Sequence, residues 1–178
     1  MKDTPTRSGV RAMITDPVLL LAHGFGSGLA PKAPGTFGTF AALLPWYFMA
    51  QWPVWMYGIV VVLAALAGVW LCGEAQRRLG VAGDADPGSI VWDEWVGVWI
   101  ALAGVPLLGV PLNDPVVAWP WIVAAVLLFR MFDIFKPGPI GWLDRHVHGG
   151  WGIMLDDVAA GLFALLTLFG LHWLLGLL

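Results

Sequence analysis

The chain has 178 residues, of which 59% are hydrophobic and 12% are charged. Soluble domains carry about 25% charged residues, so this composition excludes an ordinary soluble protein and predicts an integral membrane protein. The sequence has no basic tract of the kind that binds nucleic acid, and its net charge of −3 does not identify a partner. We expect one membrane domain over residues 16–178 and an N-terminal tail over residues 1–15.

Long uncharged runs indicate where the chain crosses the bilayer. A helix needs roughly 20 apolar residues to span a hydrocarbon core of about 30 Å. The runs predict an all-α, polytopic transmembrane bundle with about five membrane helices, at residues 37–51, 53–73, 94–111, 116–135 and 157–177. The first run is short and contains Pro45, so four crossings plus a re-entrant segment are the alternative.

The distribution of basic residues favours five crossings. With five, every lysine and arginine falls on one side of the membrane, and the turns on the other side carry only Asp114. With four, the basic residues would be divided between the two sides. The positive-inside rule then assigns the charged loops to the cytoplasm, and the first membrane helix serves as the signal for insertion.

The first cytoplasmic loop contains a helix start at Asp16 and Pro17, followed by a glycine-rich stretch. Alternate glycines let backbone N–H groups approach an anion closely, which makes Gly26, Ser27 and Gly28 candidates for phosphate binding. An irregular loop without a ligand is the alternative interpretation. Two residues of this loop are weaker candidates: His23 and Lys32.

The second cytoplasmic loop ends in two adjacent acids, Asp93 and Glu94, where a membrane helix begins. Acids at a helix N-terminus are favoured by the helix dipole, so capping alone is one explanation for them. Small residues at 97, 101 and 104 lie near one face of this helix and predict close packing of a neighbouring helix. The acids should therefore lie beside protein. Asp86, earlier in the loop, is a weaker candidate.

The fourth predicted membrane helix ends with three charged residues before Pro137. Arg130 and Asp133 are three residues apart and should be neighbours on the helix surface, as should Asp133 and Lys136. The helix spans only if its last two turns include Arg130 and Asp133. Ionisable groups at that depth usually face a polar cavity. A snorkelling arginine with a compensating aspartate is the alternative.

The last cytoplasmic loop supplies Arg145, with Asp144 and His148 as weaker candidates, and ends at Asp156 and Asp157. We expect this acidic pair to open the final membrane helix, as the earlier pair opens the third.

Helix ends thus gather five carboxylates and three cations at one membrane face. Carboxylate oxygens with few nitrogen or sulfur ligands suit Mg²⁺, and cations beside them suit a phosphate ester. A salt-bridge network that only holds the helices together is the alternative. The predicted metal ligands and catalytic acids are Asp93, Glu94, Asp133, Asp156 and Asp157, and the predicted phosphate-binding cations are Arg130, Lys136 and Arg145.

Four groups of residues are shared with a known family. They are Gly24 to Gly28 with Pro31 and Pro34 to Thr36; Ile90 to Glu94; Arg130 to Pro137 with Pro139, Ile140, Asp144 and Arg145; and Gly149 to Met154 with Asp156 and Asp157. From about residue 17 to its C-terminus, the chain resembles the phosphatidylglycerophosphatase A family of bacteria. The resemblance implies a Mg²⁺-dependent phosphatase of the inner membrane, which converts phosphatidylglycerophosphate into phosphatidylglycerol and inorganic phosphate. It implies a phospholipid substrate and no obligate protein partner.

The sequence leaves alternatives for the chemistry and for the functional class. In the favoured in-line displacement, one carboxylate acts as general base on water or, alternatively, as a nucleophile. Cys72 and Arg78 match the spacing of cysteine phosphatases, but the residues between them look helical, whereas that mechanism needs a loop. A small transporter, or an assembly subunit without chemistry, are the other functional classes; the confinement of the charges to one face is evidence against transport.

Overall fold

The computed structural model describes residues 15–80 and 87–176, and every regular element in these ranges is a helix. This confirms the all-α prediction for the described residues. The predicted N-terminal tail, apart from its last residue, and the weak candidate Asp86 lie outside them. That residues 16–178 form a single domain stays a prediction.

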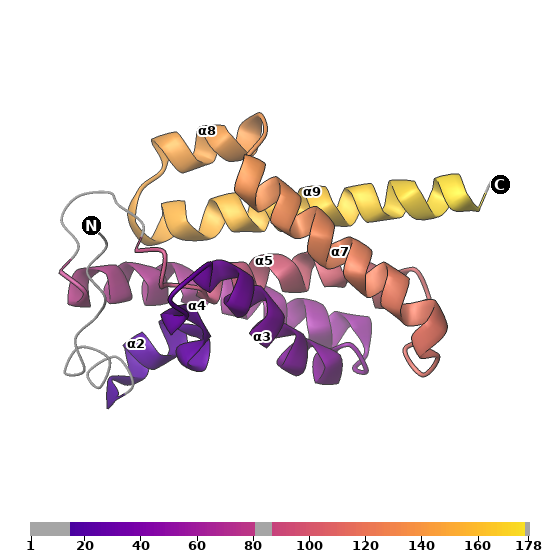
Figure 1. Ribbon diagram of the computed structural model, residues 1–178, viewed down its shortest axis with the longest axis horizontal. Coiled ribbons are helices and arrows are strands. Elements are labelled where there is room, and N and C mark those ends of the chain that lie inside the picture. Colours follow the sequence, from indigo (N-terminus) through magenta and orange to yellow (C-terminus); the bar gives the residue numbers. More distant parts are fainter. Residues whose placement is uncertain (1–14, 81–86, 177–178) are drawn as a thin grey trace.

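Nine helical elements occur in the described ranges. They are α2 (Pro17–Ala22), the 3₁₀ element η1 (Gly24–Leu29), α3 (Pro34–Met49), α4 (Val54–Arg78), α5 (Trp92–Leu102), α6 (Gly104–Leu107), α7 (Pro115–Phe135), α8 (Pro139–His146) and α9 (Gly149–Leu175). Helix α9 lies along the length of the molecule and packs against α4, α5, α7 and α8 (Figure 1).

Three of the helices, α4, α7 and α9, are long and apolar enough to cross a membrane. The other two predicted crossings correspond to helices that are too short to count among these candidates. Helix α3 has 16 residues and contains Pro45, and α5 has 11 residues, about 16 Å. Helix α5 ends at Leu102 because Pro106 has no backbone N–H to donate to the Leu102 carbonyl. A membrane protein with three spanning candidates is therefore supported, and five crossings stay a prediction.

Helices α5 and α9 approach each other through glycines. A Cβ on Gly97 would lie 2.8 Å from the backbone oxygen of Asp157, and a Cβ on Gly161 would collide with the backbone oxygen of Gly97. A Cβ on Gly104 would in turn lie 2.7 Å from Leu168 on α9. This confirms the close packing predicted from the small residues of α5.

The final helix begins earlier than predicted. Helix α9 starts at Gly149, so Asp156 and Asp157 lie two turns inside it and do not open it. The sequence was misleading because Gly149, Gly150 and Gly152 resemble a loop. Gly150 serves packing instead: a Cβ on it would collide with the backbone of α4 at Val69.

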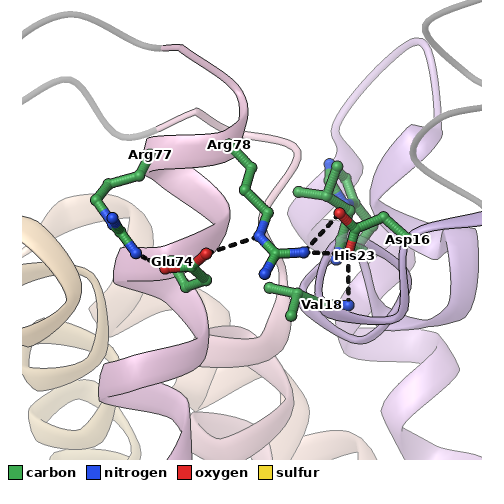
Figure 2. A network of polar contacts seen from close by, with 7 residues as sticks. Asp16, Val18, His23, Glu74, Arg77 and Arg78 are labelled. Atoms are coloured by element: carbon green, nitrogen blue, oxygen red, sulfur yellow. Dashed lines mark hydrogen bonds and ion pairs between the residues drawn. The ribbon is translucent and has the colours of Figure 1, made fainter.

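A polar network joins α2 to the end of α4 (Figure 2). Asp16 caps α2, as the sequence predicts, by accepting a hydrogen bond of 2.9 Å from the Val18 N–H. Its carboxylate also lies 2.6 Å from Arg78, which contacts Glu74 at 2.7 Å; Glu74 pairs with Arg77 as well. The hydrogen bond from Arg78 lowers the pKa of Asp16. Arg78 therefore links the start of α2 to the end of α4.

The charged ends of the helices meet at one end of the bundle. The end of α4 packs against the start of α9, and the end of α7 contacts α9 through Lys136 and Asp156. Asp114 caps the opposite end of α7, about 30 Å away along a 21-residue helix. The described charges therefore have the one-sided distribution that the topology prediction requires.

The topology can be tested by labelling from outside the cell. Single cysteines replacing Asp114 or Arg145, in a Cys72→Ser background, should differ in their reaction with an impermeant maleimide on intact cells. We expect labelling at position 114 only, and labelling at position 145 only after the membrane is opened. Equal labelling of both positions from outside would reject the five-crossing arrangement.

Candidate active site

Three carboxylates from two helices converge at the charged end of the bundle. Asp93 and Glu94 lie in the first turn of α5, and Asp157 lies in α9. One oxygen from each side chain lies within 4.8 Å of the others, and Asp93 and Asp157 are buried. The glycine contact between α5 and α9 lies one turn further along each helix, at Gly97 and Gly161. It holds the two backbones close enough for the acids to meet.

The start of α3 lies against this cluster. A Cβ on Gly35 would collide with the Glu94 carboxylate, and it would lie 3.3 Å from Nη1 of Arg130. The positive N-terminal end of α3 therefore lies beside the Glu94 carboxylate. Gly35 was not among the predicted site residues. The sequence signal that could have identified Gly35 is its position directly after Pro34, the first residue of α3.

Arg130 and Asp133 form the ion pair that their spacing predicts. Arg130 Nη1 lies 2.6 Å from Asp133 Oδ2, and both side chains are largely buried. Asp133 also neighbours Asp157, on which its charge acts together with that of Asp93. The pair on α7 is therefore attached directly to the cluster formed by α5 and α9.

Lys136 has different partners from the one predicted. It lies 2.5 Å from both Asp144 and Asp156, and the structure shows no ion pair between it and Asp133. The reason is the backbone: Lys136 ends α7 in a left-handed conformation with φ of 43°, which turns the chain into α8. Burial alone would lower the pKa of Lys136, but the two carboxylates outweigh burial and raise it. The side chain is therefore a permanent cation.

The adjacent acids of α9 serve different groups. Successive side chains on a helix point about 100° apart. Asp157 accordingly faces α5, whereas Asp156 contacts Lys136 at the end of α7. The five predicted acids thus form two linked sets, one around Asp157 and one around Lys136.

The weaker candidates of the last loop border the second set. Asp144 and His148 line a pocket of ≈130 Å³ together with Asp156. Arg145 is exposed on α8 and reaches back over Gly141 toward the turn at Lys136: a Cβ on Gly141 would lie 3.3 Å from its Nη1.

The hydrogen-bond donors of the glycine-rich stretch bind carbonyl groups within the same stretch. The N–H groups of Gly26 and Gly28 both donate to the His23 carbonyl at 3.0 Å, and the Ser27 hydroxyl donates to the Gly24 carbonyl at 2.8 Å. His23 is buried, with Nδ1 2.5 Å from the Leu19 carbonyl, and burial lowers its pKa. Lys32 is exposed just before α3. No contact in the described residues connects Gly26, Ser27 or Gly28 with the acids, so their phosphate-binding role stays a prediction.

The first acid set is chemically suited to a divalent cation. Four carboxylates, Asp93, Glu94, Asp133 and Asp157, have one guanidinium, Arg130, among them. Buried carboxylates in such excess require a cation or protons. Within the described part of the chain, Glu94 Oε2 is buried without a hydrogen-bond partner. Hard oxygen ligands of this kind fit Mg²⁺.

The geometry does not fit a cysteine phosphatase. Residues 72–78 are helical, so no loop of amides surrounds the Cys72 thiol. Cys72 is buried, with its sulfur 3.9 Å from that of Met154, and Arg78 is paired with Asp16 and Glu74. The thiol is a packing residue.

Comparison with known proteins identifies relatives over nearly the whole chain. It is 46% identical over 170 residues to phosphatidylglycerophosphatase A of Escherichia coli (strain K12), an alignment that covers 94% of this chain and 92% of that protein. It is 43% identical to phosphatidylglycerophosphatase A of Haemophilus influenzae (strain ATCC 51907 / DSM 11121 / KW20 / Rd), covering 91% of this chain and 93% of the relative. A protein of Bacteroides thetaiotaomicron named as a candidate phosphatidylinositol-3-phosphatase is 40% identical, over 89% of this chain and 95% of its own.

No solved structure matches the chain significantly. The family model of phosphatidylglycerophosphatase A matches residues 20–172, which include every described acid and cation of the site. The chain therefore belongs to the phosphatidylglycerophosphatase A family.

Proposed function

We propose that this chain hydrolyses phosphatidylglycerophosphate to phosphatidylglycerol and inorganic phosphate, with Mg²⁺ held at the acid cluster on the cytoplasmic face of a bacterial inner membrane. The observation that carries the proposal is the convergence of Asp93, Glu94 and Asp157 within 4.8 Å, beside Arg130, in a chain of this family. The relatives' names supply the substrate. The one-sided charge supports the cytoplasmic location.

Asp93, Glu94 and Asp157 would hold the metal, with Asp133 beside them. Bound there, Mg²⁺ supplies charge that neutralises the oxygens of the transferring phosphoryl group and orients it. The ligands come from two helices whose backbones are in contact, so their relative positions are fixed before substrate binds. Such preorganisation lowers the barrier because little reorganisation accompanies the reaction.

The cations would bind the phosphate oxygens. Arg130 is oriented by Asp133, and its planar guanidinium is suited to two oxygens of one phosphate. Lys136 is oriented by Asp144 and Asp156, and its raised pKa keeps it charged. Arg145 lies near the same turn and is available at the surface. One carboxylate of the acid cluster takes the proton of the attacking water.

The distribution of charge is evidence against a transporter. A pathway for ions would need polar groups at the middle of the bundle and beyond it. In the described residues, the ion pairs lie at one end, and the buried residues in the far halves of α5, α7 and α9 are apolar or glycine. Hydrolysis at one face accounts for this arrangement.

The metal site is tested by Asp157→Asn. Asparagine keeps the shape and removes the charge, so activity should fall at least about 100-fold and more Mg²⁺ should be needed for half-maximal rate. Asp114→Asn is the matched control, because asparagine caps a helix as well as aspartate does. Phosphate release from vesicles containing phosphatidylglycerophosphate is the measurement. Near-normal turnover by the Asp157 variant would mean that the cluster is structural.

The contact between α3 and Glu94 is tested by Gly35→Ala. The added Cβ would collide with the carboxylate and displace it, and a misplacement of about 1 Å can cost about 100-fold in rate. Gly170→Ala is the control, since a Cβ there meets nothing within 4 Å. Both variants should keep the parent's thermal midpoint. Full activity of Gly35→Ala would mean that hydrolysis does not depend on the observed position of the Glu94 carboxylate.

The cysteine mechanism is tested by Cys72→Ser with and without chelator. The serine variant should keep most of its activity, because a buried hydroxyl on a helix can donate to a backbone carbonyl one turn earlier. EDTA should abolish phosphate release by both proteins. An inactive serine variant together with an EDTA-resistant parent would overturn the metal mechanism in favour of the thiol.

A further inference from the structure

Among the described residues, Arg145 is the arginine that has no carboxylate partner. The other arginines in these ranges form ion pairs, namely Arg77 with Glu74, Arg78 with Asp16 and Glu74, and Arg130 with Asp133. Arg145 is exposed on α8, and its side chain makes no hydrogen bond or ion pair within the described part of the chain. An exposed guanidinium of this kind presents its N–H donors to an anion from outside the protein.

The Arg145 guanidinium lies beside the turn that carries Lys136. A Cβ on Gly141 would collide with the Lys136 carbonyl and would lie 3.3 Å from Nη1 of Arg145, so both groups border the same glycine. Lys136 in turn contacts Asp156, and the next residue, Asp157, belongs to the acid cluster. Charged groups therefore follow one another from the acid cluster to Arg145.

The cations become more exposed along this series. The Arg130 side chain is 18% exposed beside the acid cluster, that of Lys136 is 29% exposed, and Arg145 lies at the surface. Along α7, Lys136 follows Arg130 by a rise of about 9 Å. An anion reaches Arg130 only by entering the protein, whereas an anion bound by Arg145 stays at the surface.

The proposed substrate has two phosphates that differ in charge. Its terminal phosphate is a monoester with close to two negative charges at neutral pH, and its other phosphate is a diester with one. A glycerol separates the two phosphorus atoms, with a span of roughly 7 Å when it is extended, given bond lengths near 1.5 Å. This span is similar to the spacing of Arg130 and Lys136 along α7, so the two phosphates can contact the inner and the outer cations at the same time.

Burial and charge determine which phosphate lies at which position. The diester is joined to diacylglycerol in the bilayer, so it remains at the surface, whereas the terminal phosphate is able to enter the buried cluster. A dianion also gains more than a monoanion from a divalent cation at the acids. The diester has two unesterified oxygens, and the paired donors of a guanidinium match them.

We propose that Arg145, with Lys136 beside it, binds the phosphodiester of the substrate, while Arg130 and the acid cluster bind the terminal phosphate. The inference rests on the proposed function, and it makes Arg145 a residue that selects lipids with two phosphates over lipids with one. The diester does not react, so its charge is the same before and during the reaction. Arg145 therefore binds the ground state and the transition state equally, which lowers KM and leaves kcat unchanged.

The test removes the charge from each partner separately. Arg145→Gln removes it from the protein, and a methyl ester on the diester phosphate removes it from the substrate. In neutral detergent micelles, Arg145→Gln should lower kcat/KM for the unmodified substrate at least about 10-fold, the loss expected for a hydrogen bond to a charged group. For the methyl ester the same variant should cost less than about twofold, because no charge is left for Arg145 to bind. The loss should appear in KM.

Two further variants serve as comparisons. Arg77→Gln is the matched control, since Arg77 is an exposed arginine at the same charged end of the bundle, where it pairs with Glu74 (Figure 2). It should change kcat/KM for neither substrate. Arg130→Gln should lower kcat by the same factor for both substrates, because the methyl ester leaves the terminal phosphate intact.

A second measurement needs no turnover of a modified lipid. Glycerol 1,3-bisphosphate contains both phosphates of the headgroup, and glycerol 3-phosphate contains one. The bisphosphate should inhibit the parent protein more strongly than the monophosphate does. Arg145→Gln should weaken inhibition by the bisphosphate about 10-fold and leave inhibition by the monophosphate unchanged.

Other outcomes have distinct meanings. An equal loss on the unmodified and the methylated lipid, or no loss on the unmodified one, would overturn the assignment of Arg145 while leaving the hydrolase intact. If the methyl ester instead removed the effect of Arg130→Gln, the two phosphates would be bound the other way round. A parent protein that releases no phosphate from the unmodified substrate would overturn the proposed function itself.

Discussion

The backbone contact between Gly97 and Gly161 is the constraint on which the site depends. Helices with side chains at these positions would separate by the width of a methyl group or more, because their backbones already touch. Asp93 and Asp157 lie one turn away on the same faces, so any separation there would spread the acid cluster. Membrane helices gain little from the hydrophobic effect when they associate, which makes close backbone packing an important source of affinity between α5 and α9.

The two cations of α7, Arg130 and Lys136, have different carboxylate partners. A buried carboxylate cluster is costly unless its charge is balanced, and Arg130 balances it only partly. The remaining excess of negative charge supports the proposal that the site holds a divalent cation. Lys136 pairs with Asp144 and Asp156 and not with that cluster. In the proposed mechanism it would therefore offer positive charge to a phosphate without neutralising the proposed metal ligands. The left-handed turn at Lys136 makes this separation possible.

The start of α3 completes the surroundings of the acid cluster. Gly35 brings the N-terminus of this helix to Glu94, and the same helix exposes Phe40, Leu44 and Phe48. At about 100° per residue, these three side chains lie about 140° to 220° around the helix from Gly35. The helix therefore contacts the acids with one face and exposes apolar side chains on the opposite face.

The sequence by itself determined the membrane class, the one-sided charge, the Arg130–Asp133 pair and the abundance of carboxylates at the charged end. These depend on composition or on spacing within one helix, which 3.6 residues per turn makes predictable. Only the tertiary structure decided that Lys136 pairs with Asp144 and Asp156, that Asp156 and Asp157 serve different sets, and that Gly35 contacts Glu94. Those contacts join different helices, so they depend on how the helices cross and on a turn at Lys136 that no residue type specifies. The start of α9 at Gly149 was missed for a related reason: α4 packs against this segment at Gly150, and nothing local to the segment indicates α4.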